Sequence, residues 1–287
     1  MRRSDGRAPP GWWRSVGATA RQGLLSAQRL LPPSWQSQQA ILRHRPIPDA
    51  LWQPTLARFP FLTWREPGRQ QRLRELATLF LARKQFVPAG GLVLSDDMAV
   101  AIAAQACLPI LSRGLHCYAS FTDIVIHPDQ VVAQREVVDD SGVVHHYEEV
   151  LAGEAMAGGP VMLSWQDVRQ AQDAVPGYNV VVHEFVHVLD MLDGEIDGVP
   201  PLSAGISPHE WTDTLWQAFD RHSEALARGE DTWLDPYAAE SGLMEFFPVV
   251  TEAFFVAPST LRQGFADVYA LLSRYFGEDP ASHEPRP

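Results

Sequence analysis

The chain has 287 residues, which is enough for one large domain or two modest ones with a sizeable core. Hydrophobic residues make up 46% and charged residues 20%, as in soluble globular proteins, and no apolar run reaches the roughly 18 residues of a membrane span. The formal charge of −12 at pH 7 argues against nucleic-acid binding by the folded part of the chain.

Two features concern the cellular compartment. Residues 1–10 are not followed by an apolar signal core, which argues against secretion. The only cysteines, Cys107 and Cys117, are too few for a disulfide scaffold and lack a C-x-x-C spacing. We therefore expect a cytoplasmic protein in which both cysteines serve as packing residues.

The first 45 residues differ in composition from the rest of the chain. They contain eight arginines, two Pro-Pro pairs and a single acidic residue, Asp5. Such a basic arm can contact an acidic partner or membrane headgroups, but it is more often a solvated, poorly ordered segment. We predict a poorly ordered arm at 1–45, with at most a short helix at 18–31. A folded domain at 46–276 and a disordered tail at 277–287 follow.

The first predicted elements of the domain are two helices. Apolar residues repeat at helical spacing over 70–86, and Pro88 is expected to stop this helix. Ser95, followed by two aspartates, is expected to cap a second helix that runs to Ala106.

The middle of the chain is predicted to be rich in β-structure. A strand is expected at 123–127, a hairpin at 130–138 and 142–150 around an Asp-Asp-Ser-Gly turn, and a further strand at 161–165. A short helix at 165–173 and mostly helical sequence from the loop after Pro200-Pro201 to Phe276 complete the pattern.

The strongest chemical motif is His183-Glu184-Phe185-Val186-His187, within an apolar segment that Asn179 can cap as a helix. Side chains four residues apart share one helix face, so His183 and His187 can bind one metal ion, and imidazole suits Zn²⁺. Glu184 would lie beside the metal, where it can accept a proton from a bound water. The motif also occurs by chance on surface helices. Here the helix is apolar almost all round, so we expect it to be buried around a metal.

A catalytic zinc site typically has three protein ligands and one water. Asp193 lies ten residues after His183, the spacing of the third ligand in metzincin-like patterns, but Asp190 stands where the turning glycine of that pattern would be. The helix is therefore expected to continue and to carry Asp193 about 15 Å along its axis from His183. Asp190 can instead orient one of the zinc histidines.

A second source of ligands is the apolar stretch 244–255, whose only acids are Glu245 and Glu252. They are seven residues apart, so both can face one side of a helix, and Pro248 is compatible with the first turn of that helix. A buried carboxylate needs a cation or a donor, which the zinc site would supply. The residues alone do not decide which glutamate is the third ligand.

These motifs together resemble the Mlc titration factor A (MtfA) family. The resemblance rests on the segment 183–190, on Asp197-Gly198-Val199-Pro200, on Tyr237-Ala238-Ala239 followed by Glu245-Phe246-Phe247, and on segments 82–88 and 159–165. It covers roughly residues 60–276. The resemblance implies a bacterial zinc-dependent peptidase of the gluzincin type, with a fold related to the catalytic domain of anthrax lethal factor.

The resemblance also implies roles for individual residues. One Zn²⁺ per chain would be bound by His183, His187 and Glu245, with Glu184 as the general base. Tyr237 would stabilise the oxyanion, unless it is a packed core tyrosine, and Glu252 would hydrogen-bond a zinc histidine. Two departures concern the third ligand: Tyr237 and Glu245 are one residue further apart than in the family pattern, and Pro248 replaces a typical alanine.

We predict an α+β fold, a mainly helical zincin-type metallopeptidase domain with a small β-sheet ahead of the His-Glu-x-x-His helix. The predicted function is zinc-dependent hydrolysis of peptides, and the resemblance implies aminopeptidase activity on short peptides. Exo- and endo-cleavage both stay open, because nothing in the sequence locates an amine-binding acid. The resemblance also implies an alternative, a regulatory protein that sequesters a transcriptional repressor of sugar uptake genes. A structural zinc site is less favoured, because such a site does not need Glu184.

Overall fold

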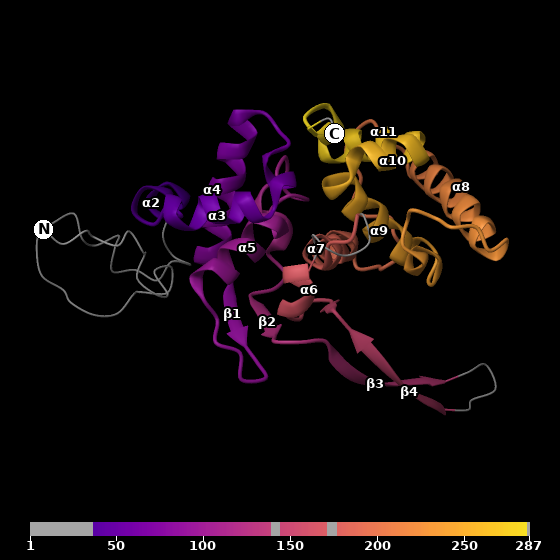
Figure 1. The fold of residues 1–287 in the computed structure, drawn as a ribbon, viewed down its shortest axis with the longest axis horizontal. Helices are drawn as coiled ribbons and strands as arrows, with labels where there is room; N and C mark the ends of the chain where they lie inside the picture. Colours follow the sequence, from indigo (N-terminus) through magenta and orange to yellow (C-terminus); the bar gives the residue numbers. More distant parts are fainter. Residues whose placement is uncertain (1–36, 139–143, 171–176, 286–287) are drawn as a thin grey trace, which may run out of the picture.

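The computed structural model describes residues 37–138, 144–170 and 177–285. The fold is α+β and mainly helical, as predicted. The helix that carries the His-Glu-x-x-His motif, α7 (Val180–Asp190), lies at the centre, with helices α2–α5 on one side and helices α8–α11 on the other (Figure 1).

The N-terminal side is built from helices that enclose an alanine-rich one. Its elements are α2 (Gln38–His44), α3 (Asp49–Arg58), the 3₁₀-helix η2 (Pro60–Thr63), α4 (Pro67–Arg83), α5 (Asp96–Ala106) and the 3₁₀-helix η3 (Leu115–Tyr118). The Ser95 side chain accepts a hydrogen bond from the amide of Met98 and caps α5, as predicted. Because its side chains are small, α5 packs closely against α3, α4 and α7.

The helix predicted at 70–86 differs from the observed one at both ends. Helix α4 begins at Pro67 and ends at Arg83, and Phe86 belongs instead to strand β1 (Gln85–Pro88). The reason is a distant partner, since β1 pairs in parallel with β2 (Asp123–His127). Helical periodicity in the sequence does not reveal this pairing.

A four-stranded sheet lies beside α7, with the strand order β1-β2-β6-β5. Strands β2 and β6 (Val161–Ser164) confirm the predicted strands, although Trp165 already begins α6 (Trp165–Gln170). The short edge strand β5 (Gly153–Ala155) pairs with β6 in the antiparallel direction and packs against α7.

Strands β3 (Val131–Val138) and β4 (Val144–Leu151) form a separate antiparallel hairpin that projects away from the helices (Figure 1). The predicted strands are confirmed, and the turn expected around residues 139–142 lies outside the described residues. Strand β4 leads directly into β5, so the base of the hairpin lies close to α7.

Helix α7 is buried, as predicted for a helix that is apolar almost all round. Its Phe185 packs against the rings of Phe80, Tyr118 and Phe121. The prediction that the α-helix continues to Asp193 is wrong: α7 ends at Asp190, and the 3₁₀-helix η4 (Met191–Asp193) and a left-handed Gly194 follow.

The C-terminal side is helical, as predicted. It consists of α8 (Pro208–Ala227), the 3₁₀-helix η5 (Pro236–Ala239), α9 (Leu243–Val256), α10 (Pro258–Gly264), α11 (Ala266–Phe276) and the 3₁₀-helix η6 (Pro280–Ser282). Pro248 lies inside α9, beyond its first turn, because the helix begins at Leu243. The apolar face of α9 packs on α7, and this contact brings the two halves of the site together.

Both ends of the described chain contact the domain. Ile41 of α2, in the segment expected to be a poorly ordered arm, is fully buried. Glu278, in the segment expected to be a disordered tail, is buried with its carboxylate 3.6 Å from the guanidinium of Arg65.

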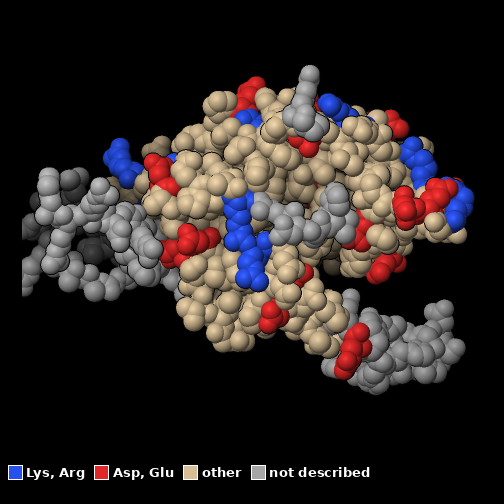
Figure 2. Space-filling model, in the orientation of Figure 1, with Lys and Arg blue, Asp and Glu red and all other residues tan. Residues whose placement is uncertain are grey.

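None of the helices in the described parts of the chain is long and apolar enough to cross a membrane. On the face shown in Figure 2, the visible Lys and Arg side chains occur in small separate groups, with acidic side chains between them.

Candidate metal centre

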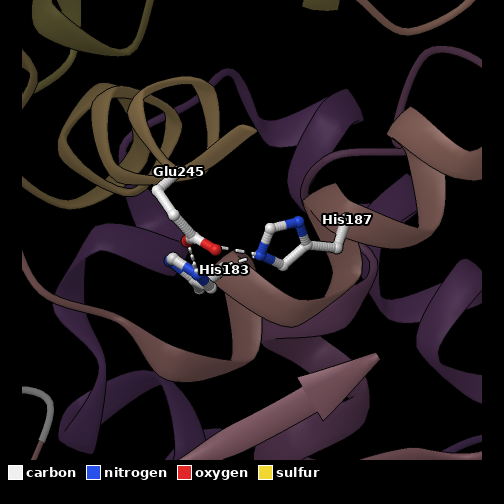
Figure 3. Close-up of side chains that lie close together, drawn as sticks. All are labelled: His183, His187 and Glu245. Carbon is white, nitrogen blue, oxygen red and sulfur yellow. Dashed lines mark hydrogen bonds and ion pairs between the residues drawn. The ribbon is translucent and has the colours of Figure 1, made fainter. Parts of the chain in front are cut away.

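Three side chains from two helices converge at the centre of the molecule. His183 and His187 project from α7, and Glu245 projects from the first turn of α9 (Figure 3). His183 Nε2 lies 3.1 Å from His187 Nε2 and 3.1 Å from Glu245 Oε2, and His187 Nε2 lies 3.6 Å from Glu245 Oε2. Among the described residues, this is the one group of three His, Cys, Asp or Glu side chains close enough to share a metal ion.

The local sequence explains how each side chain reaches this place. The Asn179 side chain accepts a hydrogen bond from the Val182 amide at 2.9 Å and fixes the start of α7, as predicted. From that start, the spacing of four residues places both histidines on one face of the helix. Glu245 is the third residue of α9, and the packing of α9 on α7 points its carboxylate at the histidines.

The geometry fits a metal ion. Ligands bound tetrahedrally at the usual zinc distances of about 2.0–2.2 Å are about 3.3 Å apart, close to the three separations observed. His183 Nδ1 donates a hydrogen bond to Glu252 Oε1 at 2.7 Å, so the neutral imidazole would present the lone pair of Nε2 to a metal ion between His187 and Glu245. Three electron-rich atoms this close together require a positive charge between them.

The charge balance agrees with this reading. Burial opposes the charged form of His183, but hydrogen bonds with Glu245 and Glu252 raise its pKa well above the usual value. Burial opposes the charged form of Glu245 as well, yet its hydrogen bonds with His183 and His187 hold its pKa well below the usual range. The cluster therefore favours a positive charge, and in the metal-free protein a proton on histidine supplies it.

A hydrogen-bonded chain behind the site holds His183 in place. The buried Glu252 accepts from His183 with one carboxylate oxygen and from the backbone amide of Asn179 with the other. The Asn179 side chain in turn donates to Gln105 Oε1 on α5 at 2.8 Å. Sequence reasoning missed Gln105, because it is 74 positions from Asn179 and sits in an alanine-rich helix without any motif.

Glu184 is buried beside the two histidines, with 5% of its surface exposed, and is not one of the three converging side chains. Its carboxylate lies over Gly153 of β5, whose missing side chain leaves the space that Glu184 occupies. Burial raises the pKa of Glu184 to about 7, against the opposing effect of His183 and His187. A carboxyl group with a pKa near neutrality can both accept and return a proton.

Asp190 is fully buried, and its Oδ2 accepts a hydrogen bond from the Gly198 amide at 2.9 Å. Its Oδ1 and His187 Nδ1 are both buried without a hydrogen-bond partner among the described residues. Asp190 therefore anchors the segment after α7, and a direct bond to a histidine is not among its contacts in the described part of the chain. Its role in orienting His187 stays a prediction.

The remaining candidates lie at different distances from the cluster. Tyr237 of η5 is 39% exposed, and its ring centroid lies 6.0 Å from that of His183. Asp193 is exposed and accepts a hydrogen bond from the Glu195 amide, outside the converging group. The structure thus brings Tyr237 near His183 and leaves Asp193 on the surface.

Comparison with known proteins shows the family to which the chain belongs. The sequence profile of the glucose-regulated metallo-peptidase M90 family matches residues 33–277. Mlc titration factor A of Serratia proteamaculans is 36% identical over 248 residues, which cover 85% of this chain and 93% of that protein. An uncharacterized protein of a Synechocystis strain is 34% identical over 86% of this chain and 89% of its own length.

A third relative, Mlc titration factor A of Yersinia pestis, is 33% identical over 83% of this chain and 87% of its own length. The family match covers the described elements from α2 to α11, including both helices that supply the converging side chains. A metallopeptidase family implies a bound metal, and the His-His-Glu cluster is the candidate place for it. The chain belongs to the glucose-regulated metallo-peptidase M90 family.

Proposed function

We propose that this protein is a zinc-dependent peptidase in which His183, His187 and Glu245 bind the metal and Glu184 is the general base. The observation that carries the proposal is the convergence of these three side chains within 4.8 Å, with a buried carboxyl group of raised pKa next to them. The two nitrogens and one oxygen are a donor set that suits Zn²⁺.

The chemistry divides between the metal and the protein. Zinc, when bound, acidifies a water molecule and polarises the carbonyl of the scissile bond. The Glu184 carboxylate takes a proton from the attacking water and gives it to the leaving nitrogen. Glu252 keeps His183 in the tautomer that presents Nε2, because it accepts the hydrogen bond from Nδ1.

Tyr237 is proposed to stabilise the negative charge that develops on the carbonyl oxygen. Its ring lies near His183, and its partial exposure leaves it accessible to a bound peptide. A phenol that donates a hydrogen bond to an oxyanion typically contributes about 10²–10³-fold to kcat. We therefore expect Tyr237→Phe to lower kcat while the metal content stays unchanged.

We propose short peptides as substrates, including aminopeptidase cleavage at a free N-terminus, and the cytoplasm as the place of action. Buried thiols at Cys107 and Cys117, neither of them paired, agree with a reducing compartment. Both endo- and exo-cleavage are compatible with the described site, so the two modes are best separated by comparing free and N-acetylated versions of one peptide.

The proposal is tested with Glu184→Gln, which keeps the size of the side chain and removes the base. We expect full metal content and loss of peptide hydrolysis, measured on a fluorogenic peptide library alongside zinc analysis. Glu240→Gln, at an exposed glutamate that is not among the converging side chains, is the matched control and should retain activity. Full activity of Glu184→Gln would overturn the mechanism.

A second candidate function comes from the name of two relatives, Mlc titration factor A, which refers to titration of a protein called Mlc. By analogy, this chain would bind and sequester a transcriptional repressor. The exposed side chains of Met244, next to Glu245, and of Trp216, whose ring lies by Gly242 just before α9, provide apolar surface for such a partner. Binding of a repressor should survive Glu184→Gln, whereas a function that depends on hydrolysis should not.

A further inference from the structure

A cavity of about 190 Å³ opens beside the metal cluster, on the side of His183 and Glu184. Neither His187 nor Glu245 is among the described residues that line it. The cavity therefore extends from one side of the cluster, and Glu184 lies between the cavity and the cluster.

The position of Glu184 shows which part of a peptide reaches this cavity. In the proposed hydrolysis, the leaving nitrogen must come within hydrogen-bond distance of Glu184 to receive its proton. The residue that contributes this nitrogen is the one after the scissile bond, so it stands against the Glu184 side of the cluster. A cavity that borders Glu184 is therefore in place to receive the side chain of this substrate residue.

The walls of the cavity are mostly apolar. Val249 and Ala253 are one turn apart on α9, Val180 begins α7, and Leu234 and Leu151 come from the segments before η5 and β5. An apolar cavity of about 150 Å³ in another protein accommodates a benzene molecule, so this cavity has room for a leucine or phenylalanine side chain. Burial of such a side chain would contribute to substrate binding in proportion to the apolar area removed from water.

Apart from His183, which faces the proposed metal, the charged side chains at the cavity are acidic. Glu184, Asp235 and Glu252 line it, and no Lys or Arg is among its described lining residues. Burial raises the pKa of the hydroxyl of Tyr178, another lining residue, and the carboxyl groups of Asp167, Glu252, Glu184 and Asp235 raise it further. An acidic side chain placed here would be desolvated next to like charges.

We propose that this cavity is the specificity pocket for the residue after the scissile bond, and that it selects bulky apolar side chains and rejects acidic ones. The inference rests on the proposed peptidase function and adds the substrate class to it. Val249 and Ala253 then set the size of the accepted side chain, because they form the α9 wall.

The test uses the full-length zinc-loaded protein and a set of internally quenched peptides that differ only in the residue after the scissile bond. Gly, Ala, Leu, Phe and Asp stand at that position, and mass spectrometry of the products identifies the bond cleaved. We expect kcat/KM for Leu and Phe to exceed that for Gly by at least about 10-fold, and Asp to be the poorest.

Two variants on the same helix link the preference to the cavity. Val249→Phe fills the cavity, and the Leu-to-Gly ratio of kcat/KM should fall to within about 2-fold of unity. Val256→Phe makes the same replacement at a half-buried valine of α9 that is not among the lining residues, and it should leave the ratio unchanged. The ratio of kcat/KM for two substrates does not depend on the fraction of folded enzyme, so reduced stability of a variant does not affect the result.

The outcomes separate this inference from the function it rests on. Three results would overturn the pocket and leave the peptidase function intact. They are equal kcat/KM for all residues after the scissile bond, a kcat/KM for Asp equal to that for Leu, and a Leu-to-Gly ratio in Val249→Phe equal to that of the wild type. If the zinc-loaded wild type cleaves none of the peptides, the proposed function itself fails, and the inference falls with it.

Discussion

Gly153 is the residue that leaves room for Glu184. A Cβ atom at this position would lie 2.4 Å from Glu184 Oε1 and 2.5 Å from its Cγ, far closer than non-bonded atoms approach each other. Any larger residue would therefore displace the carboxylate that is proposed to move the proton. This dependence arises because the edge strand β5 packs directly on α7.

We predict that Gly153→Ala lowers kcat by about 10²-fold or more, because a displacement of about 1 Å in a catalytic group has an effect of that size. Zinc content should stay at the wild-type level, since Glu184 is not a proposed ligand. Gly68→Ala, where a Cβ atom would meet nothing within 4 Å, is the matched control and should be fully active. Wild-type kcat in Gly153→Ala would show that Glu184 does not need its observed position.

The pH dependence of activity should report the ionisation of Glu184. Burial raises its pKa to about 7 in the metal-free protein, and a bound cation would favour the carboxylate and lower that pKa. Because the base must be ionised, kcat/KM should fall as pH decreases, with the midpoint of this acid limb below about 7. The profile is measured with metal content determined at each pH, and a midpoint above 7 would contradict the assignment of Glu184.

The candidate site could be located from the sequence because its central part is local. The spacing of His183 and His187, the cap at Asn179 and the adjacent Glu184 all lie within nine positions of one helix. Residue spacing alone left Glu245 and Glu252 equivalent, and the family resemblance pointed to Glu245. In the structure, the packing of α9 on α7 directs Glu245 to both histidines and Glu252 to Nδ1 of His183. That choice depends on the packing of two helices, which residue spacing does not encode.

At the scale of elements, Gly198 connects three helices around the site. Its amide donates to Asp190 at the end of α7, and its carbonyl accepts from the Trp211 indole of α8 at 2.8 Å. A Cβ atom at Gly198 would lie 2.3 Å from the carbonyl oxygen of Leu243, the first residue of α9. Glu245 is two residues further on, so this contact sets its position relative to the histidines.

We predict that Gly198→Ala weakens zinc binding by about 10-fold or more, because the start of α9 must shift and second-sphere changes typically cost 10–100-fold in affinity. Gly194→Ala is the control: Gly194 also has a positive φ, +101°, but a Cβ atom there would meet nothing within 4 Å. Both variants share the backbone strain, and only one has the close contact. Equal zinc affinities in a chelator competition assay would refute the role of the contact.

The observed elements differ from the predicted ones where contacts between residues far apart in the sequence determine the local structure. Phe86 fits the helical repeat of 70–86, but pairing of β1 with β2 takes it into a strand. The end of α7 at Asp190 follows from the hydrogen bond of Asp190 to Gly198 and the left-handed Gly194, which turn the chain back. Elements with strong local signals, such as α5 with its Ser95 cap, appear where the sequence predicts them.

At the scale of the whole molecule, the site joins the two sides of the fold, because two of the proposed ligands come from α7 and one from α9. Zinc binding should therefore stabilise the folded protein. At a free zinc concentration of 100 times Kd, linkage predicts about 2.7 kcal/mol, or an increase in Tm of about 5–10 °C for a domain of this size.

This prediction is checked by thermal unfolding in zinc and in chelator. Glu245→Ala should lose most of the increase in Tm, because the remaining histidines come from one helix and no longer connect it to α9. Asp213→Ala, at an exposed aspartate paired with His209, should keep the increase. A Tm that does not respond to zinc in the wild type would indicate that the cluster does not bind it.

The outer parts of the molecule were the least predictable from the sequence. Glu278 follows the last helix in a segment rich in polar residues and proline, yet it is buried against Arg65, more than 200 positions earlier. Nothing in its local sequence indicates this partner. The composition of a segment predicts disorder only when no distant residue binds it.

The central claim is that His183, His187 and Glu245 form one zinc site, and the most direct test is the metal content of purified protein. Wild type, Glu245→Ala and Asp193→Ala are compared by elemental analysis after dialysis against metal-free buffer. The account predicts about one zinc per chain in the wild type and in Asp193→Ala, and loss of zinc in Glu245→Ala. Retention of zinc in Glu245→Ala, or its loss in Asp193→Ala, would contradict the account.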